Sequence, residues 1–392
     1  MDCLRPLRAR ADTSGGQSRG RAGDVPLSFG FDPASWHSAG DHLRDPTRRP
    51  GRVDESRMAI MDAITLHPRH LYELSGEASA GKTQLSLQLV VRAVLSGGGG
   101  GGGSAAAGDD TVSLCRAVYL FTEGGTLKMD RLRQIASSRL GDEALTDAVM
   151  RHVHVEYATS VDGVISTLLM LEDVLREGGD ASQGRHIGDR PNDNAPPPVR
   201  LLVLDSIAHV FRFRDHGDTK YDSHDASRSQ AFFKIASILK RYADEYKIAV
   251  LVTNQVVDAI DDGGGATGES DRPGCAGLTL ETSGRKVYPA LGLAWASCVT
   301  TRLFVTKETA MCEETRGARS VVVEGAGGAK QLRGLQVVFS PEMKQIKTHF
   351  VVETAGCVGV DVAGAGVALG LGGGVVAAKG HCARPSAPSQ RR

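Results

Sequence analysis

The sequence of 392 residues lacks any uninterrupted apolar run near the ~20 residues that a membrane-spanning helix needs. It also lacks an excess of charge of one sign, because 46 Lys and Arg residues balance 46 Asp and Glu residues. This balance excludes a protein whose overall field attracts nucleic acid or an anionic membrane, although it is compatible with a local basic patch. We therefore expect a soluble protein that has no membrane among its partners.

Cysteine is scarce, with seven residues that are widely spaced and form no CxxC pair. This pattern predicts neither a disulfide framework nor a zinc site. No apolar segment of a signal peptide opens the chain, so we expect a reducing, intracellular compartment. The Arg-rich first 21 residues faintly resemble an organelle transit peptide, but a disordered tail is the favoured interpretation.

Glycine, by contrast, is abundant and clustered, with 48 residues in the chain. Three glycine-rich or polar stretches predict flexible insertions in surface loops. They lie at about 96–111 (with seven consecutive glycines), 178–198 and 261–277. Residues 1–57 predict a disordered N-terminal segment and residues 356–392 a low-complexity tail. One ordered domain is therefore expected over residues 58–355.

Short β-type apolar runs alternate with helical patterns inside this domain. The predicted strands are 71–74, 117–121, 201–204, 249–253, 301–305, 335–339 and 350–352. Apolar residues recur at three- and four-residue steps from Phe232 to Tyr246, which predicts an amphipathic helix. This alternation predicts an α/β fold with a mainly parallel central sheet flanked by helices, which the later strands extend.

The strongest motif is the phosphate-loop pattern GxxxxGK[ST], at Gly76-Glu77-Ala78-Ser79-Ala80-Gly81-Lys82-Thr83. A predicted strand precedes it and a helical pattern follows it, as the motif requires. The backbone N–H groups of such a loop and the helix N-terminus bind phosphates. Lys82 is predicted to reach the β- and γ-phosphates and the Thr83 hydroxyl to bind Mg²⁺. The chain is therefore predicted to bind a nucleoside triphosphate.

Three further predicted strands end in a polar side chain. Asp205 is favoured as a second ligand of Mg²⁺, through a water, over a role as a helix cap. Glu123 is equally compatible with orienting a water for attack on the γ-phosphate and with a surface or capping acid. Gln255 could sense the γ-phosphate, although an ordinary loop residue is the better interpretation of this residue taken alone.

Four segments together resemble the RecA-type recombinases of eukaryotes. They are the phosphate loop through Leu85, residues 119–123 followed by Arg131-Leu132, residues 202–206 and residues 252–256. A fifth segment contains PALGLAWA at residues 289–296, followed by Thr301-Arg302-Leu303, and it narrows the resemblance to one recombinase paralogue. The resemblance covers about residues 68–355 and implies a RecA-type P-loop NTPase core.

The resemblance implies an ATPase that uses Mg²⁺, is stimulated by DNA, and acts in homologous recombination and double-strand-break repair. By position, Glu123 matches the family's water-activating glutamate. Gln255 matches the glutamine that couples the γ-phosphate to the second DNA-binding loop. Gln84 belongs to the matching phosphate-loop segment and is assigned with it to the nucleotide. Arg131 matches an arginine that packs on adenine, with one extra residue between it and Glu123.

The resemblance also places two DNA-facing loops, at about residues 211–224 and 258–286. The candidates for contact with DNA phosphates are Arg212, Arg214 and Lys220 in the first loop and Arg272, Arg285 and Lys286 in the second. Loops that are merely solvated are the alternative. The implied ligands are single-stranded and branched DNA, the implied partners are other recombinase paralogues in a hetero-oligomer, and the implied location is the nucleus.

Two other functions are compatible with a phosphate loop. A structural subunit could bind ATP for assembly and turn it over negligibly, but the intact set of Lys82, Thr83, Asp205 and Glu123 argues against a degenerate site. A phosphate-loop kinase for a small metabolite would need an acceptor-binding lid, and no segment resembles one.

Phe31-Asp32-Pro33-Ala34 fits the FxxA pattern by which recombinases dock onto a neighbour, although a chance match is favoured.

Overall fold

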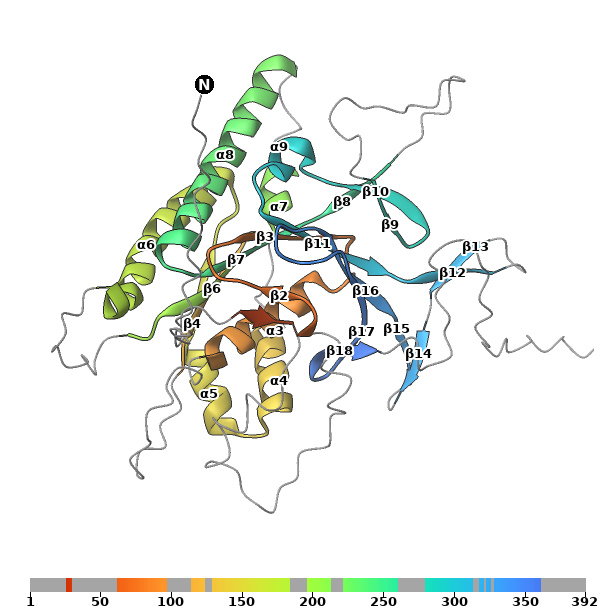
Figure 1. The fold of residues 1–392 in the computed structure, drawn as a ribbon, viewed down its shortest axis with the longest axis horizontal. Coiled ribbons are helices and arrows are strands. Elements are labelled where there is room, and N and C mark those ends of the chain that lie inside the picture. Colours follow the sequence, from red (N-terminus) through yellow and green to blue (C-terminus); the bar gives the residue numbers. More distant parts are fainter. Residues whose placement is uncertain are drawn as a thin grey trace, which may run out of the picture.

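One nine-stranded sheet organises the chain (Figure 1). The computed structural model describes residues 26–29, 62–96, 114–123, 129–183, 196–212, 221–259, 279–312, 317–320, 322–325 and 328–360. Across the sheet the strand order is β18-β17-β16-β11-β3-β7-β6-β4-β5. The glycine tract, the insertion at 261–277 and the FxxA segment lie outside the described residues.

Six neighbouring strands of this sheet are parallel. They are β3 (Leu71–Gly76), β4 (Arg116–Phe121), β5 (Val153–Tyr157), β6 (Val199–Asp205), β7 (Ala249–Asn254) and β11 (Thr301–Lys307). The strands β6 and β7 are buried along their whole length, because helices cover both faces of the sheet. Three antiparallel strands extend it: β16 (Arg333–Phe339), β17 (Lys347–Glu353) and β18 (Gly356–Val360). The expected α/β fold with a mainly parallel sheet is confirmed.

Successive residues of the central strands point to opposite hydrophobic cores. On β3, Leu71 joins one core and Tyr72 the other, and on β6 Leu202 and Val203 divide in the same way. Helices α3 (Lys82–Leu95), α4 (Met129–Leu140) and α5 (Glu143–Arg151) pack in the core of Tyr72. Helices α6 (Val161–Gln183), α7 (Ile207–Arg212), α8 (Tyr221–Glu245) and α9 (Gly292–Ala296) pack in the core of Leu71. The amphipathic helix expected around Phe232–Tyr246 is the second half of α8.

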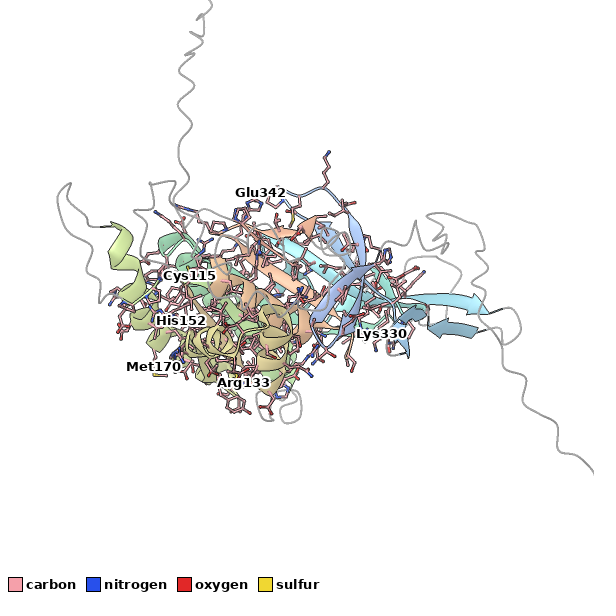
Figure 2. All side chains as sticks on the ribbon, turned by 90° about the horizontal axis from the view of Figure 1, so that it is seen from below. Cys115, Arg133, His152, Met170, Lys330 and Glu342 are labelled. Carbon is pink, nitrogen blue, oxygen red and sulfur yellow. The ribbon has the colours of Figure 1, made fainter. Side chains whose placement is uncertain are left out.

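The outer surface of the helical layer is polar and ion-paired where α4 meets α5. Arg133 points outward there (Figure 2), and its guanidinium group lies 2.8 Å from Glu143 and 2.6 Å from Asp147. Such exposed pairs contribute little to stability. Among the described residues, none of the helices is both long enough and apolar enough to span a bilayer.

A small sheet beside the main one has the order β8-β10-β9. Its strands are β8 (Val256–Asp258), β9 (Leu280–Thr282) and β10 (Arg285–Pro289). The other described strands pair two by two: β1 (Leu27–Ser28) with β2 (Thr65–Leu66), β12 (Thr309–Cys312) with β13 (Gly317–Ser320), and β14 (Val322–Gly325) with β15 (Gly328–Gln331). Because β8 follows β7 almost directly, the small sheet is attached to the carboxyl edge of the main sheet.

Three expected boundaries differ from the structure. Residues 26–29 fall in the segment expected to be disordered, yet they contain β1, and Phe29 is fully buried. Residues 356–360 fall in the expected tail, yet they form β18 at the edge of the main sheet. Helix α6 continues to Gln183, into the insertion expected from residue 178. The strands β1 and β18 are ordered because they bury apolar side chains against α3.

One buried amide on α3 joins these two ends. Gln88 is 1% exposed, and its Nε2 donates to the carbonyl oxygens of Phe29 and Cys357. Its Oε1 accepts a hydrogen bond of 2.7 Å from the Cys357 N–H group and one of 3.1 Å from Arg139. The side chain therefore makes all four of these hydrogen bonds only when both β1 and β18 are in place.

Candidate nucleotide-binding site

The phosphate loop connects β3 to α3, and glycine is required at two of its positions. At Gly76 a Cβ atom would lie 2.6 Å from the carbonyl oxygen of Val305, so only glycine lets β3 pass this close to β11. Gly81 has a φ of 116°, a left-handed conformation that side chains disfavour. No side chain caps α3 at Gly81, which leaves the N–H groups of the first turn available to an anion.

A cleft of about 750 Å³ opens at this loop. Its lining residues are Ala78, Ser79, Gly81, Lys82, Thr83, Gln84, Glu123, Arg131, Gln134, Asp205, Ser206, Gln255, Arg333, Val352, Glu353 and Thr354. All five residues predicted to act on the γ-phosphate or to hold the metal are among them. Of the predicted nucleotide-binding residues, Gly76, Glu77 and Ala80 do not line the cleft. The carboxyl ends of β3, β4, β6 and β7 meet here, as expected for ligand sites of parallel sheets.

Lys82 lies folded against its own loop. Its Nζ donates to the carbonyl oxygens of Gly76, at 2.7 Å, and Glu77, at 2.9 Å. Burial lowers the pKa of Lys82 to about 8, even though the negative charges of Asp205 and Glu123 raise it in part. The ammonium group is therefore poorly solvated and close to losing its proton at mildly alkaline pH.

The affinity for Mg·ATP is expected to be constant below pH 8 and to fall above it, by up to about tenfold per pH unit. The reason is that only protonated Lys82 can pair with phosphates, and the bound phosphates raise its pKa, so binding above pH 8 takes up a proton. Calorimetric titration from pH 7 to 9.5 measures this. The Lys82→Arg variant, which stays charged, should show no such fall, and a wild-type affinity that stays flat to pH 9.5 would contradict the prediction.

The carboxylate of Asp205 is held by three hydroxyl groups. Its Oδ2 accepts from Thr83 Oγ1 at 2.9 Å and from Tyr119 at 2.7 Å, and its Oδ1 accepts from Thr253. Burial, and then the charge of Asp205, raise the pKa of Tyr119, so this phenol remains a donor. Tyr119 and Thr253 were not predicted, because each looks like an ordinary member of an apolar strand.

Thr83 and Asp205 together suit Mg²⁺. The ion prefers one or two protein oxygen ligands, completed by substrate phosphates and water, and a hydroxyl beside a carboxylate provides that set. Within the part of the chain that the structure describes, no cluster of three or more His, Cys, Asp and Glu residues could hold a metal alone. Thr83 and Asp205 would leave the other positions of a bound Mg²⁺ to phosphate and water oxygens.

Glu123 and Gln255 are in direct contact at the far side of the phosphate loop. Gln255 Nε2 donates to Glu123 Oε1 at 3.0 Å, and Ser206 Oγ donates to the same oxygen at 3.2 Å. The Gln255 N–H group donates to the side chain of Asn254, whose Nδ2 donates to the buried Glu73. The sequence pattern alone gave Glu123 two equally compatible roles and favoured an ordinary loop role for Gln255. The fold brings the two side chains into contact.

The opposite end of the cleft is built by residues distant in sequence. Arg131 on α4 donates through Nε to Gln84, at 2.7 Å, and through Nη1 to the carbonyl of Thr354, at 2.8 Å. Arg333 on β16 lies close enough to Gly81 that a Cβ there would contact it. Sequence reasoning missed Gln134, Arg333 and residues 352–354, because the antiparallel strands that supply most of them carry no local motif.

The candidate DNA contacts are only partly described. Arg214, Lys220 and Arg272 lie outside the described residues, and Arg212 is the last residue of α7. Arg285 and Lys286 are both exposed on β10. Arg285 is paired with two carboxylates, Glu77 at 3.0 Å and Asp258 at 2.6 Å.

Comparison with known proteins agrees with this geometry. Residues 191–288 match the model of the Rad51 family. The DNA repair protein XRCC3 homolog of Arabidopsis thaliana is 29% identical over 291 residues, which cover 73% of this chain and 85% of that protein. The DNA repair protein XRCC3 of Mus musculus is 27% identical over 294 residues, 73% of this chain and 68% of that protein. The meiotic recombination protein DLH1 of Candida albicans is 31% identical over 235 residues, which cover 60% of this chain and 56% of that protein. The expected resemblance to a RecA-type recombinase paralogue is confirmed.

Proposed function

We propose that this chain, in which residues 191–288 match the Rad51 family and which is similar to the XRCC3 proteins, is an ATP-dependent protein of DNA repair and homologous recombination. The observation that carries the ATP-dependent part is the convergence of Lys82, Thr83, Asp205, Glu123 and Gln255 on one cleft beside a phosphate loop. The recombination part is supported by the names of the relatives.

Each residue has a distinct task in this proposal. The loop N–H groups and Lys82 bind the phosphates, while Thr83 and Asp205 would hold Mg²⁺, which would neutralise phosphate charge. Glu123 orients a water toward the γ-phosphorus and accepts its proton, so that ADP and inorganic phosphate are formed. Gln255, which donates to Glu123, is proposed to exchange this partner for the γ-phosphate. Arg131, which donates to Gln84, is the proposed contact for the adenine.

The segment that follows Gln255 is the proposed link to DNA. Strand β8 begins one residue after Gln255 and leads into residues 260–278, the segment of the second expected DNA loop. Of the described candidates, the exposed Lys286 is the better phosphate contact. The proposed ligands are single-stranded and branched DNA, the proposed partners are other recombinase paralogues in a hetero-oligomer, and the proposed location is the nucleus.

A structural subunit with negligible turnover is the second candidate. The hydrogen bonds from Gln255 and Ser206 to Glu123 favour it, because they occupy an oxygen that would have to accept a proton from water. The two candidates differ in turnover and not in ATP binding.

Steady-state ATP hydrolysis with and without single-stranded DNA tests the proposal. We expect hydrolysis that DNA stimulates, and a Glu123→Gln variant that loses about 100-fold in turnover, because the general base is removed. Its affinity for Mg·ATP should change less than about threefold, since the amide retains the size of the side chain and one acceptor oxygen for Gln255 and Ser206.

Two results would contradict the proposal in different ways. Unchanged turnover in Glu123→Gln would remove this residue from the reaction. Tight ATP binding together with background turnover, whether or not DNA is present, would leave the structural subunit as the function.

A further inference from the structure

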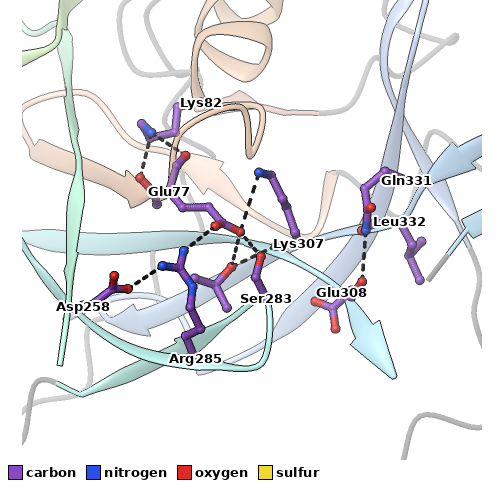
Figure 3. A network of polar contacts seen from close by, with 11 residues as sticks. Glu77, Lys82, Asp258, Ser283, Arg285, Lys307, Glu308, Gln331 and Leu332 are labelled. Atoms are coloured by element: carbon purple, nitrogen blue, oxygen red, sulfur yellow. Dashed lines mark hydrogen bonds and ion pairs between the residues drawn. The ribbon is translucent and has the colours of Figure 1, made fainter. Parts of the chain in front are cut away.

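The second residue of the phosphate loop, Glu77, directs its side chain away from the cleft and toward the small sheet (Figure 3). Its Oε2 lies 3.0 Å from Arg285, and its Oε1 accepts hydrogen bonds from Thr282, at 2.9 Å, and Ser283. Lys307 on β11 approaches the same oxygen at 3.9 Å. Most of these partners belong to the β9–β10 hairpin, so the hairpin is fastened to the phosphate loop through one carboxylate.

This carboxylate is buried and charged. The side chain of Glu77 is 9% exposed. Burial raises its pKa, but the hydrogen bonds from Ser283 and Thr282, the charge of Lys307 and the hydrogen bond from Arg285 together outweigh that effect, so the pKa lies below the ordinary value. A buried carboxylate that loses a partner is costly, and the hairpin contacts are therefore stronger than those of an exposed ion pair.

The hairpin in turn holds both ends of the segment 260–278. Strand β10 pairs with β8, which precedes the segment, and with β9, which follows it. The Ala290 N–H group donates to the carbonyl of Gln255 at 2.8 Å, and the Ala259 N–H group donates to that of Lys286 at 2.9 Å. A movement of the hairpin would therefore move the residues that flank this segment on both sides, in β8 and β9.

Glu77 is also connected to the nucleotide site through its backbone. Its carbonyl oxygen accepts the hydrogen bond from Lys82, which must leave it in order to reach a phosphate. The ammonium group then carries its positive charge away from Glu77, and Arg285 and Lys307 remain as the cations beside the carboxylate. Lys82 and Lys307 repel each other, so this movement relieves a repulsion on the cation that lies beside the Glu77 carboxylate and is bonded to Thr282 of the hairpin.

We propose that Glu77 and Arg285 transmit nucleotide binding from the phosphate loop to the β9–β10 hairpin, and that Arg285 is a positioning residue and not a contact for DNA phosphates. This inference rests on the proposed binding of ATP and adds a second connection to the DNA loop, separate from Gln255. Nucleotide binding tightens the hairpin, and the carboxylates of Glu77 and Asp258 keep Arg285 occupied.

Hydrogen–deuterium exchange of the full chain, with and without Mg²⁺ and ATPγS, tests the inference. We expect the N–H groups of residues 279–290 to exchange about fivefold or more slowly in the presence of the nucleotide. Arg285→Gln should lose this difference and Arg285→Lys should retain part of it. Lys286→Gln is the matched control, because it removes a neighbouring charge whose side chain points to the other face of the strand, and it should keep the whole difference. Ser283→Ala, which removes one donor to Glu77, should reduce it.

Calorimetric titration with the same nucleotide separates the possible failures. Wild-type protein that binds no nucleotide would overturn the proposed function and this inference with it. Protein that binds the nucleotide without slower exchange in the hairpin would overturn the inference alone. So would an equal loss in Arg285→Gln and Lys286→Gln, because the effect would then depend on the charge of the hairpin and not on the contact with Glu77.

Discussion

Replacing Lys82 by alanine should weaken the binding of Mg·ATP at least about 100-fold, because the cation that pairs with the phosphates is removed from a largely buried position. The fold should survive. Burial of the ammonium group opposes folding, as its lowered pKa indicates, so the variant loses hydrogen bonds to Gly76 and Glu77 but also an unfavourable buried charge.

The measurement combines calorimetric titration of nucleotide with thermal unfolding of the same samples. Lys344→Ala is the control, because this exposed lysine lies outside the cleft and its removal changes the net charge equally. Lost binding at an unchanged melting temperature fits the assignment. Retained binding would mean that the loop holds its ligand through backbone groups alone, and a lower melting temperature would mean that Lys82 is structural.

The largest loss of stability is expected from Arg302→Met. Arg302 and Glu73 are both 0% exposed, and Arg302 Nε lies 2.6 Å from Glu73 Oε2, which ties β11 to β3. Asn254 Nδ2 donates to the other oxygen of Glu73 at 2.6 Å. Removing the guanidinium group leaves a buried charge without its cation, and the free energy of unfolding should fall by about 3–5 kcal/mol.

A second substitution should reverse most of that loss. In Glu73→Gln with Arg302→Met the buried charge is gone, and the glutamine can still accept from Asn254, so stability should approach that of the wild type. Denaturant unfolding of both variants is the measurement, and Arg133→Gln, at an exposed pair, should change little. If the double variant is as unstable as the single one, the packing of Arg302 on the Phe339 ring, at 5.3 Å, provides the stability instead of the charge pair.

The parts of the site that were predicted best are those formed by residues contiguous in the sequence. The phosphate loop occupies eight successive residues with the strand and helix that it requires, so its position follows from local chemistry. Glu123, Asp205 and Gln255 could be proposed because parallel strands bring their carboxyl ends to one edge. By contrast, Tyr119 and Thr253 orient Asp205 from inside apolar strands, where a hydroxyl gives no signal until the neighbouring strand is known.

For a related reason, the sequence could not predict that the outer segments β1 and β18 are ordered. A strand of two residues such as β1 has too few side chains for a periodic pattern, and β18 is rich in glycine and valine like the tail that follows it. Both are ordered by what they pack against. Likewise, Arg285 is a free surface cation in the sequence, and only the fold gives it two carboxylate partners.

The amide of Gln88 sets limits on how the protein can be shortened. Deleting residues 26–29 would remove one acceptor of the buried Gln88 amide, and deleting residues 356–360 would remove one acceptor and one donor, at a cost of about 1–3 kcal/mol for each hydrogen bond lost. A shortened chain that keeps all the hydrogen bonds of this amide must therefore include both segments, although neither lines the cleft. Affinity tags and fluorescent fusions are best attached beyond these two segments, where they leave the amide undisturbed.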